Sequence, residues 1–147
     1  MSAISKIFYS LKGHWKFSRH ITDQGTVEGI ACFRKKANHP HVLLYREEGV
    51  FTSLKGQQHR ISQEYEYRYS EEKIDVFFAR ERNQLLHSLE FTGPHQASGQ
   101  HLCGKDTYFA AYQFHFPGSF ELQYVVKGPK KDYQIQTLFS KHNSGKY

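Results

Sequence analysis

The 147-residue sequence predicts an all-β protein with a short N-terminal helix, folded as an antiparallel up-and-down β-barrel of about nine or ten strands. Three observations predict this fold. Apolar and polar residues alternate with a period of two over most of the chain. Turn residues (Gly, Pro, Asp and Asn) recur at short intervals between the alternating segments. Closure into a barrel rather than a sandwich is favoured because it removes the exposed edge strands of so long a sheet.

One helix is predicted, at the N-terminus. Its apolar side chains fall on one helical face between residues 2 and 12, and Gly13 lies just past its end. These side chains are Ile4, Ile7, Phe8 and Leu11. A single short amphipathic helix needs a partner, so we expect it to cap an open end of the sheet.

The strands are predicted from the alternating segments that follow. These segments are 14–21, 26–36, 42–48, 61–69, 74–78, 85–91, 101–103, 106–114, 120–126 and 131–139. Turns are expected at 23–25, 37–40, 49, 55–56, 70–73, 117–118 and 128–129, with a loosened stretch at 92–99. Residues 1–141 would then form one barrel domain with a capping helix, and residues 142–147 a frayed tail.

Composition narrows the classes of function. A net charge of +6 fits either a nucleic-acid or phosphate partner or an ordinary lysine-rich surface, and no run of five like charges decides between them. No apolar run reaches the roughly 18 residues of a membrane span, and the N-terminus lacks the apolar core of a signal peptide. We therefore expect a cytoplasmic protein without a membrane partner. Two cysteines, Cys32 and Cys103, give no disulfide framework, and no ligand spacing predicts a metal or cofactor.

Charged and polar residues occur in phase with apolar ones on four predicted strands. They are Arg19, His87, Asp106, Lys131 and several tyrosines, among them Tyr108, Tyr112 and Tyr133. A buried charge must pair with another charge or with a ligand. Arg19 and Lys131 together outnumber Asp106 by one positive charge, which predicts a small anionic ligand such as a phosphate or carboxylate. The alternative is a structural network in which Arg19 pairs with Asp106 and Lys131 joins them, with tyrosine hydroxyls filling in and no ligand.

His101 and Cys103 lie two residues apart on one strand face. This spacing is compatible with a Cys/His nucleophile pair, although a structural cysteine is the commoner explanation. Asp106 falls on the other face by simple alternation, unless Gly104 forms a bulge that resets the pattern.

Five motifs together resemble a known family. They are Leu11-x-Gly13-x-Trp15-x-x-x-Arg19-x-Ile21, Leu44-Tyr45-x-Glu47-x-Gly49, Tyr67-Arg68, His101-x-Cys103-x-x-Asp106-x-Tyr108 and Gly128-Pro129-x-Lys131-Asp132-Tyr133. In this order they resemble an uncharacterised family known only as domain of unknown function 6314, which is associated with lipocalin- or calycin-like barrels. The resemblance covers nearly the whole chain. It implies site residues at Arg19, Arg68, His101, Asp106, Tyr108, Lys131 and Tyr133, but no activity. It also implies a tryptophan within 120–126, where this chain has none.

Three functions are compatible with these observations. The first is a barrel that binds a small anionic or amphipathic ligand through Arg19, Arg68, His87, His101, Asp106, Tyr108, Tyr112, Lys131 and Tyr133. The second is a hydrolase or isomerase acting on a phosphorylated metabolite, with His101 as general base, Asp106 as its orienting group and Lys131 as the anion stabiliser. The third is an RNA- or partner-binding surface formed by Arg34, Lys35, Lys36, Lys127 and Lys130.

Overall fold

The computed structural model describes residues 2–81 and 83–142, which form one helix and ten strands. They are α1 (Ala3–Ser10), β1 (Gly13–Ile21), β2 (Gly25–Lys36), β3 (His39–Ser53), β4 (Gln58–Ser70), β5 (Lys73–Phe78), β6 (Leu85–Gly93), β7 (Gln96–Cys103), β8 (Asp106–His115), β9 (Ser119–Lys127) and β10 (Asp132–His142). No helix within these residues is long and apolar enough to cross a membrane. His142 belongs to β10, and the rest of the predicted tail, 143–147, lies outside the described residues.

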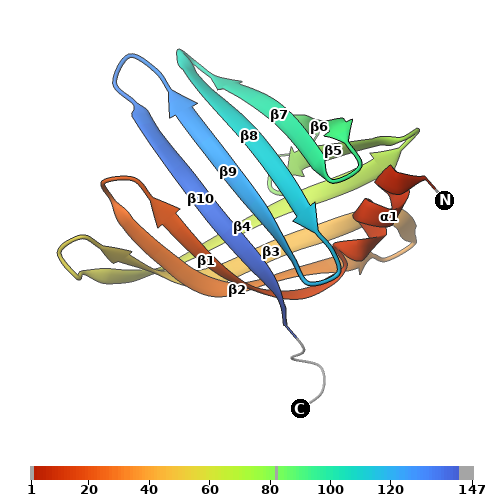
Figure 1. Ribbon diagram of the computed structural model, residues 1–147, viewed down its shortest axis with the longest axis horizontal. Coiled ribbons are helices and arrows are strands. Elements are labelled where there is room, and N and C mark those ends of the chain that lie inside the picture. The colour runs from red at the N-terminus through yellow and green to blue at the C-terminus, as the bar shows by residue number, and fades with distance from the viewer. Residues whose placement is uncertain (1, 82, 143–147) are drawn as a thin grey trace.

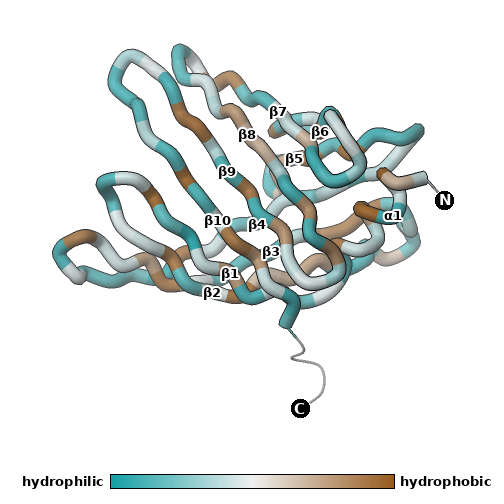
Figure 2. The backbone as a smooth tube through the Cα atoms, in the orientation of Figure 1, coloured by the Kyte–Doolittle hydropathy of each residue, from teal (hydrophilic) through white to brown (hydrophobic). Residues whose placement is uncertain are grey.

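The ten strands form a closed antiparallel barrel, which confirms the predicted fold (Figure 1). Each strand pairs with the next along the chain, and β10 pairs with β1 to close the sheet, with Phe17 opposite Phe139. Because consecutive strands are antiparallel neighbours, short hairpins suffice to connect them. Figure 2 shows the alternation of apolar and polar residues along β8, β9 and β10. In β8 and β10 the buried positions alternate with exposed ones, so one face of each strand forms the interior.

Two predicted chain breaks are wrong, and close packing explains both. Gly49 lies inside β3 opposite Gly29, where the Phe17 ring packs across the pair; a Cβ on Gly49 would lie 2.7 Å from the Glu28 carbonyl oxygen. Gly99 lies inside β7, and a Cβ there would lie 3.0 Å from the His87 ring. These glycines admit a neighbouring ring or strand instead of marking a turn.

Helix α1 closes one end of the barrel, as the amphipathic pattern predicts. The Ser2 side chain accepts a hydrogen bond from the Ser5 amide at 3.1 Å and so caps the first turn. On the inner face Phe8 is fully buried and packs against Tyr69. The Trp15 indole N–H donates to the Leu11 carbonyl at 2.8 Å, which fixes the end of the helix to β1.

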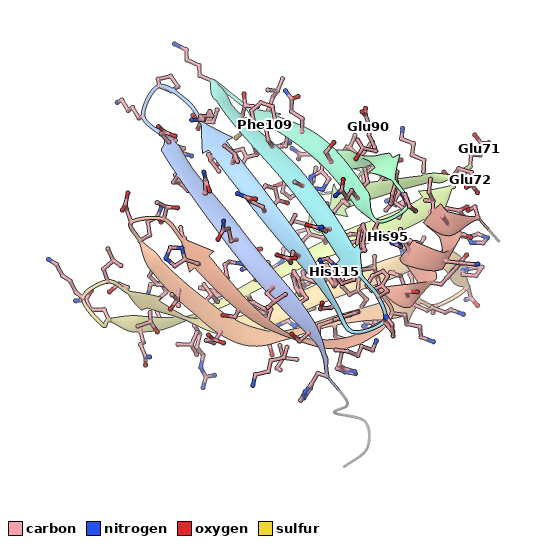
Figure 3. All side chains as sticks on the ribbon, in the orientation of Figure 1. Glu71, Glu72, Glu90, His95, Phe109 and His115 are labelled. Carbon is pink, nitrogen blue, oxygen red and sulfur yellow. The ribbon has the colours of Figure 1, made fainter. Side chains whose placement is uncertain are left out.

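The two ends of the barrel differ, because successive strands run in opposite directions. The turns after β2, β4, β6 and β8 lie beside α1, and we call this the helix end. The turns after β1, β3, β5, β7 and β9 lie at the other end, the open end. In Figure 1, α1 is at the right, while the hairpins after β1, β3 and β9 lie to the left and upper left. Figure 3 labels Glu71 and Glu72, which form the turn after β4 beside α1.

The helix half of the interior is solid with aromatic and aliphatic side chains. Trp15 meets Phe120 edge to face, and Phe120 stacks on Phe139 with ring centroids 4.3 Å apart. Leu43 and Ile74 complete this packing and are almost fully buried. Aromatic rings in contact at these distances stabilise the fold by more than the apolar area they bury. This half of the barrel therefore holds the main core.

Candidate ligand-binding site inside the barrel

A cavity of about 380 Å³ occupies the open half of the barrel. Its walls are mostly aromatic and aliphatic, and are formed by Ile21, Phe33, Tyr45, Tyr65, Tyr67, Phe78, Leu86, Phe120, Leu122, Tyr124, Ile135 and Phe139. The polar lining residues are Arg19, Glu47, Gln63, His101, Cys103, Tyr108 and Thr137. A concave apolar space with a few polar groups is the usual form of a small-molecule site.

Arg19 makes the principal polar contact inside the cavity, and its partner is Glu47. The guanidinium donates from Nη1 to Glu47 Oε2 at 2.7 Å and from Nη2 to Glu47 Oε1 at 2.8 Å. Its Nε donates to the Thr137 hydroxyl at 2.8 Å. The predicted pairing of Arg19 with Asp106 is therefore wrong, and so is the predicted surplus positive charge, because Glu47 balances Arg19.

The Arg19–Glu47 pair is buried in the barrel wall. The Glu47 side chain is 1 % exposed and that of Arg19 is 12 % exposed. Burial opposes the charge on Arg19, but the hydrogen bonds and charge of Glu47 outweigh it and raise the pKa of the guanidinium. Burial, together with the Glu47 charge, raises the pKa of Tyr45, which donates to Glu47 Oε1 and stays protonated. The carboxylate thus has three donors.

Sequence reasoning missed Glu47, although a signal for it was present. Leu43, Tyr45 and Glu47 alternate along β3, so a carboxylate lies in phase with two buried residues. The same criterion identified Arg19. Sequence alone does not show that β1 and β3, separated by β2, bring these two side chains within bonding distance across the barrel wall.

Lys131 and Asp106 form a second polar cluster at the open end, together with Tyr108 and Tyr133; we call it the mouth cluster. Lys131 Nζ lies 3.2 Å from Asp106 Oδ2 and donates to the Tyr108 hydroxyl at 3.2 Å. These hydrogen bonds raise the pKa of Lys131, while burial and Tyr108 raise that of Tyr133. Lys131 is 41 % exposed, so its ammonium remains in contact with solvent.

The Gly128-Pro129 turn shapes the mouth cluster. The Asp106 carboxylate packs directly onto Gly128, in space that a Cβ would occupy. Asp106 can therefore reach Lys131 across the turn that joins β9 to β10. Glycine at this position is a packing requirement of the Lys131–Asp106 pair.

His101 and Cys103 both line the cavity on β7, and Asp106 lies on the same face. Simple alternation would place Asp106 on the opposite face unless Gly104 reset the pattern. The pattern is reset, because Gly104 and Lys105 form a two-residue hairpin turn, which sets Asp106 directly opposite Cys103. Within the described residues no hydrogen bond joins His101 to Asp106, and Asp106 pairs with Lys131. Both cysteines are free thiols.

His87 and Tyr112 are buried behind the cavity wall. His87 Nε2 lies 3.1 Å from the Tyr112 hydroxyl, which lies 3.3 Å from the hydroxyl of Tyr67, a wall residue. His87 Nδ1 is buried and has no hydrogen-bond partner within residues 2–81 and 83–142. Burial, and to a lesser extent His101, lowers the pKa of His87 to about 4, so the imidazole is neutral at physiological pH. These two residues support the wall and do not face the cavity.

Arg68 lies on the outer surface, away from the predicted site. Tyr67 points inward, so the period of two turns Arg68 outward, where it bonds Glu66 at 2.6 Å and covers the Phe77 ring. The residues proposed for an RNA-binding surface are also divided. Residues 34–36 close β2 at the helix end, whereas Lys127 and Lys130 lie at the open end. Among the described residues, no three His, Cys, Asp or Glu side chains gather closely enough to hold a metal ion.

Comparison with solved structures shows the same fold in unrelated sequences. The S-type phycobiliprotein lyase CPES from Guillardia theta superposes with a TM-score of 0.68 at 12 % identity, over 97 % of this chain and 94 % of that one. The structure of EF1p2_mFAP2b bound to DFHBI gives a TM-score of 0.50 at 12 % identity, over 95 % and 99 % of the two chains. The redesigned β-barrel mFAP0, bound to DFHBI, gives 0.50 at 12 % identity, over 90 % and 99 %. At such identities the likeness concerns the barrel alone.

No curated protein matches the sequence. A family model does match, over residues 11–141, which begins at the end of α1 and covers β1 to β9 and all of β10 except His142. The matched segment carries every motif quoted above, and so confirms the predicted family. The chain belongs to the family of unknown function DUF6314.

Proposed function

We propose that this protein binds a small amphipathic molecule in the barrel cavity and admits it through the open end. The observation that carries the proposal is the cavity itself. It measures about 380 Å³ and is walled by aromatic rings, yet it contains a fixed, internally neutral Arg19–Glu47 pair. The solved barrels bound to DFHBI support this reading, since they hold a small molecule in a barrel of the same type.

The mouth cluster indicates where an acidic group of the ligand would bind. Lys131 has three N–H bonds, of which two are directed to Asp106 and Tyr108. A carboxylate or phosphate at the open end would accept the third, while the apolar part of the ligand lay deeper among the rings. The negative charge would thereby remain close to solvent, where its desolvation costs least.

The proposal is tested with N-phenyl-1-naphthylamine, a neutral dye that fluoresces in apolar surroundings. We expect saturable binding to the purified protein. Ile135→Trp, which places a larger side chain in the cavity, should raise the dissociation constant at least about tenfold. Leu138→Trp is the matched control, since Leu138 lies on the same strand, points outward and is 47 % exposed. No saturable binding, or equal loss in both variants, would refute the cavity as the site.

The position of the acidic group is tested with 8-anilinonaphthalene-1-sulfonate, which has the same ring system and adds a sulfonate. In Lys131→Met the ratio of its affinity to that of the neutral dye should fall about fivefold, because the mouth loses its cation. Lys130→Met, one residue earlier in the same turn, is the control. An unchanged ratio in Lys131→Met would remove the acidic group from the proposal.

A further inference from the structure

Arg19 has hydrogen-bonding capacity that the protein does not use. Each terminal nitrogen of a guanidinium carries two N–H bonds. Nη1 and Nη2 each donate one of these to Glu47, and Nε donates to Thr137. Two N–H groups of a cavity-lining residue therefore remain without a partner in residues 2–81 and 83–142. They can donate to a ligand that enters the cavity.

Tyr124 adds a donor to the same wall. It lines the cavity from β9, and its hydroxyl has no hydrogen-bond partner within the described part of the chain. Burial raises the pKa of Tyr124 well above its ordinary value, so the hydroxyl keeps its proton and can donate. The charges of Arg19 and Glu47 both act on this hydroxyl, which places it in their electrostatic neighbourhood.

The charge around these donors decides which kind of acceptor group can bind to them. Glu47 already neutralises Arg19, and its oxygens take bonds from Arg19 and from Tyr45. An anion bound at Arg19 would lie next to the Glu47 carboxylate in a space of low dielectric, where like charges repel strongly. A neutral acceptor would meet the same donors without this repulsion.

We infer that the inner end of the ligand is a neutral carbonyl on a flat ring system, as in an aryl ketone, lactone or quinone. The inference rests on the proposed function and adds the chemical class of the buried group. The carbonyl oxygen accepts from Arg19 and from Tyr124, and the ring lies between aromatic walls that include Phe33, Tyr65 and Phe120. Any acidic group of the ligand stays at the mouth.

The test uses three probes of one ring system that displace N-phenyl-1-naphthylamine: 2-acetylnaphthalene, 2-ethylnaphthalene and 2-naphthoate. Competition is measured in Lys131→Met, so that the mouth cannot hold the carboxylate. We expect the ketone to bind at least about tenfold more tightly than the naphthoate, because the naphthoate must bury its charge beside Glu47. Equal or tighter binding of the naphthoate overturns the inference.

A second comparison isolates the hydrogen bond. The ratio of the dissociation constants of 2-ethylnaphthalene and 2-acetylnaphthalene should fall about fivefold in Tyr124→Phe, which removes one donor and keeps the ring. Comparing this ratio between variants cancels the different hydration of the free probes. Tyr69→Phe, at the helix end, is the matched control. An unchanged ratio in Tyr124→Phe overturns the role of Tyr124.

The two proposals fail in different ways. If the dye itself does not bind, or if Ile135→Trp leaves its affinity unchanged, the cavity is not a binding site. If the dye binds in the cavity but the probes show no preference for the ketone, the cavity binds ligands of another class.

Discussion

The two halves of the barrel are built from the same ten strands and differ in what fills them. At the helix end, large rings meet one another and α1 seals the space, so the interior is solid. At the open end, the aromatic rings surround a cavity of about 380 Å³, and a buried charged pair lies in its wall. Closure of a barrel therefore does not determine whether its interior is packed or contains a cavity. The helix at one end and the side chains that point inward determine this.

The difference between the two halves predicts that replacing a large side chain with alanine lowers the free energy of unfolding much more at the helix end than at the open end. Trp15→Ala at the helix end should lower the free energy of unfolding by about 4 kcal/mol, because it leaves a void among packed rings and removes the bond to Leu11. Ile135→Ala at the open end should cost about 1 kcal/mol, since its side chain already faces a cavity. Urea unfolding measures both, and similar costs would contradict the division.

The ion pair of the open half should behave as a unit. Glu47→Leu leaves Arg19 charged and unpaired, and should lower the free energy of unfolding by about 3 kcal/mol. Arg19→Met combined with Glu47→Leu should recover most of that loss, because it replaces both charges with apolar groups of similar size. A double variant as unstable as the single one would mean that the pair itself stabilises the fold.

His87 connects the stability of the barrel to pH. Its pKa is lowered to about 4 in the folded protein by burial, against about 6.5 in an unfolded chain. The unfolded chain therefore takes up the proton first as the pH falls. The contribution of His87 to the free energy of unfolding is therefore fully present above about pH 6.5 and is lost progressively toward pH 4. The free energy of unfolding should fall by about 2 kcal/mol between pH 7 and pH 5.

The variant His87→Gln isolates this contribution, because it keeps a polar side chain but cannot titrate between pH 7 and pH 5. Unfolding at several pH values should give a flatter dependence on pH in His87→Gln than in the unmodified protein. Identical slopes would show that His87 is not buried in its neutral form.

Gly128→Ala should have the smallest effect, confined to the mouth cluster. The added methyl group displaces the Asp106 carboxylate from its position beside Lys131. We expect a loss of stability below about 1 kcal/mol, because the pair is partly exposed. The affinity for 8-anilinonaphthalene-1-sulfonate should rise relative to that for the neutral dye, since Lys131 loses its competing partner. A fall in that ratio would contradict the arrangement.

The fold was predictable from the sequence because an up-and-down barrel is specified by local features, namely alternating apolar and polar residues and the turns between strands. The two wrong chain breaks have one physical cause. Gly49 and Gly99 were interpreted as breaks, since a glycine that admits a ring from another strand is identical in sequence to a glycine in a turn. Only the register, with Gly29 opposite Gly49, distinguishes the two cases.

The site was predictable one residue at a time but not as a set. Alternation identified Arg19 and the inward phase of His87, and the hairpin residues Asp106 and Lys131 do meet. It could not pair Arg19 with Glu47, because that contact crosses strands far apart in the chain. Arg68 was included through the family resemblance alone, although Tyr67 beside it indicates that it points outward.

Methyl-resolved NMR during titration with N-phenyl-1-naphthylamine tests the central claim most directly. We predict that the NMR signals of the Leu86, Leu122 and Ile135 methyl groups, which line the cavity, shift during the titration. The signals of Leu43 and Ile74 in the packed half should stay unchanged. Shifts confined to exposed methyl groups such as those of Leu102 and Leu138 would place the dye on the outer surface and contradict a binding cavity in the open half.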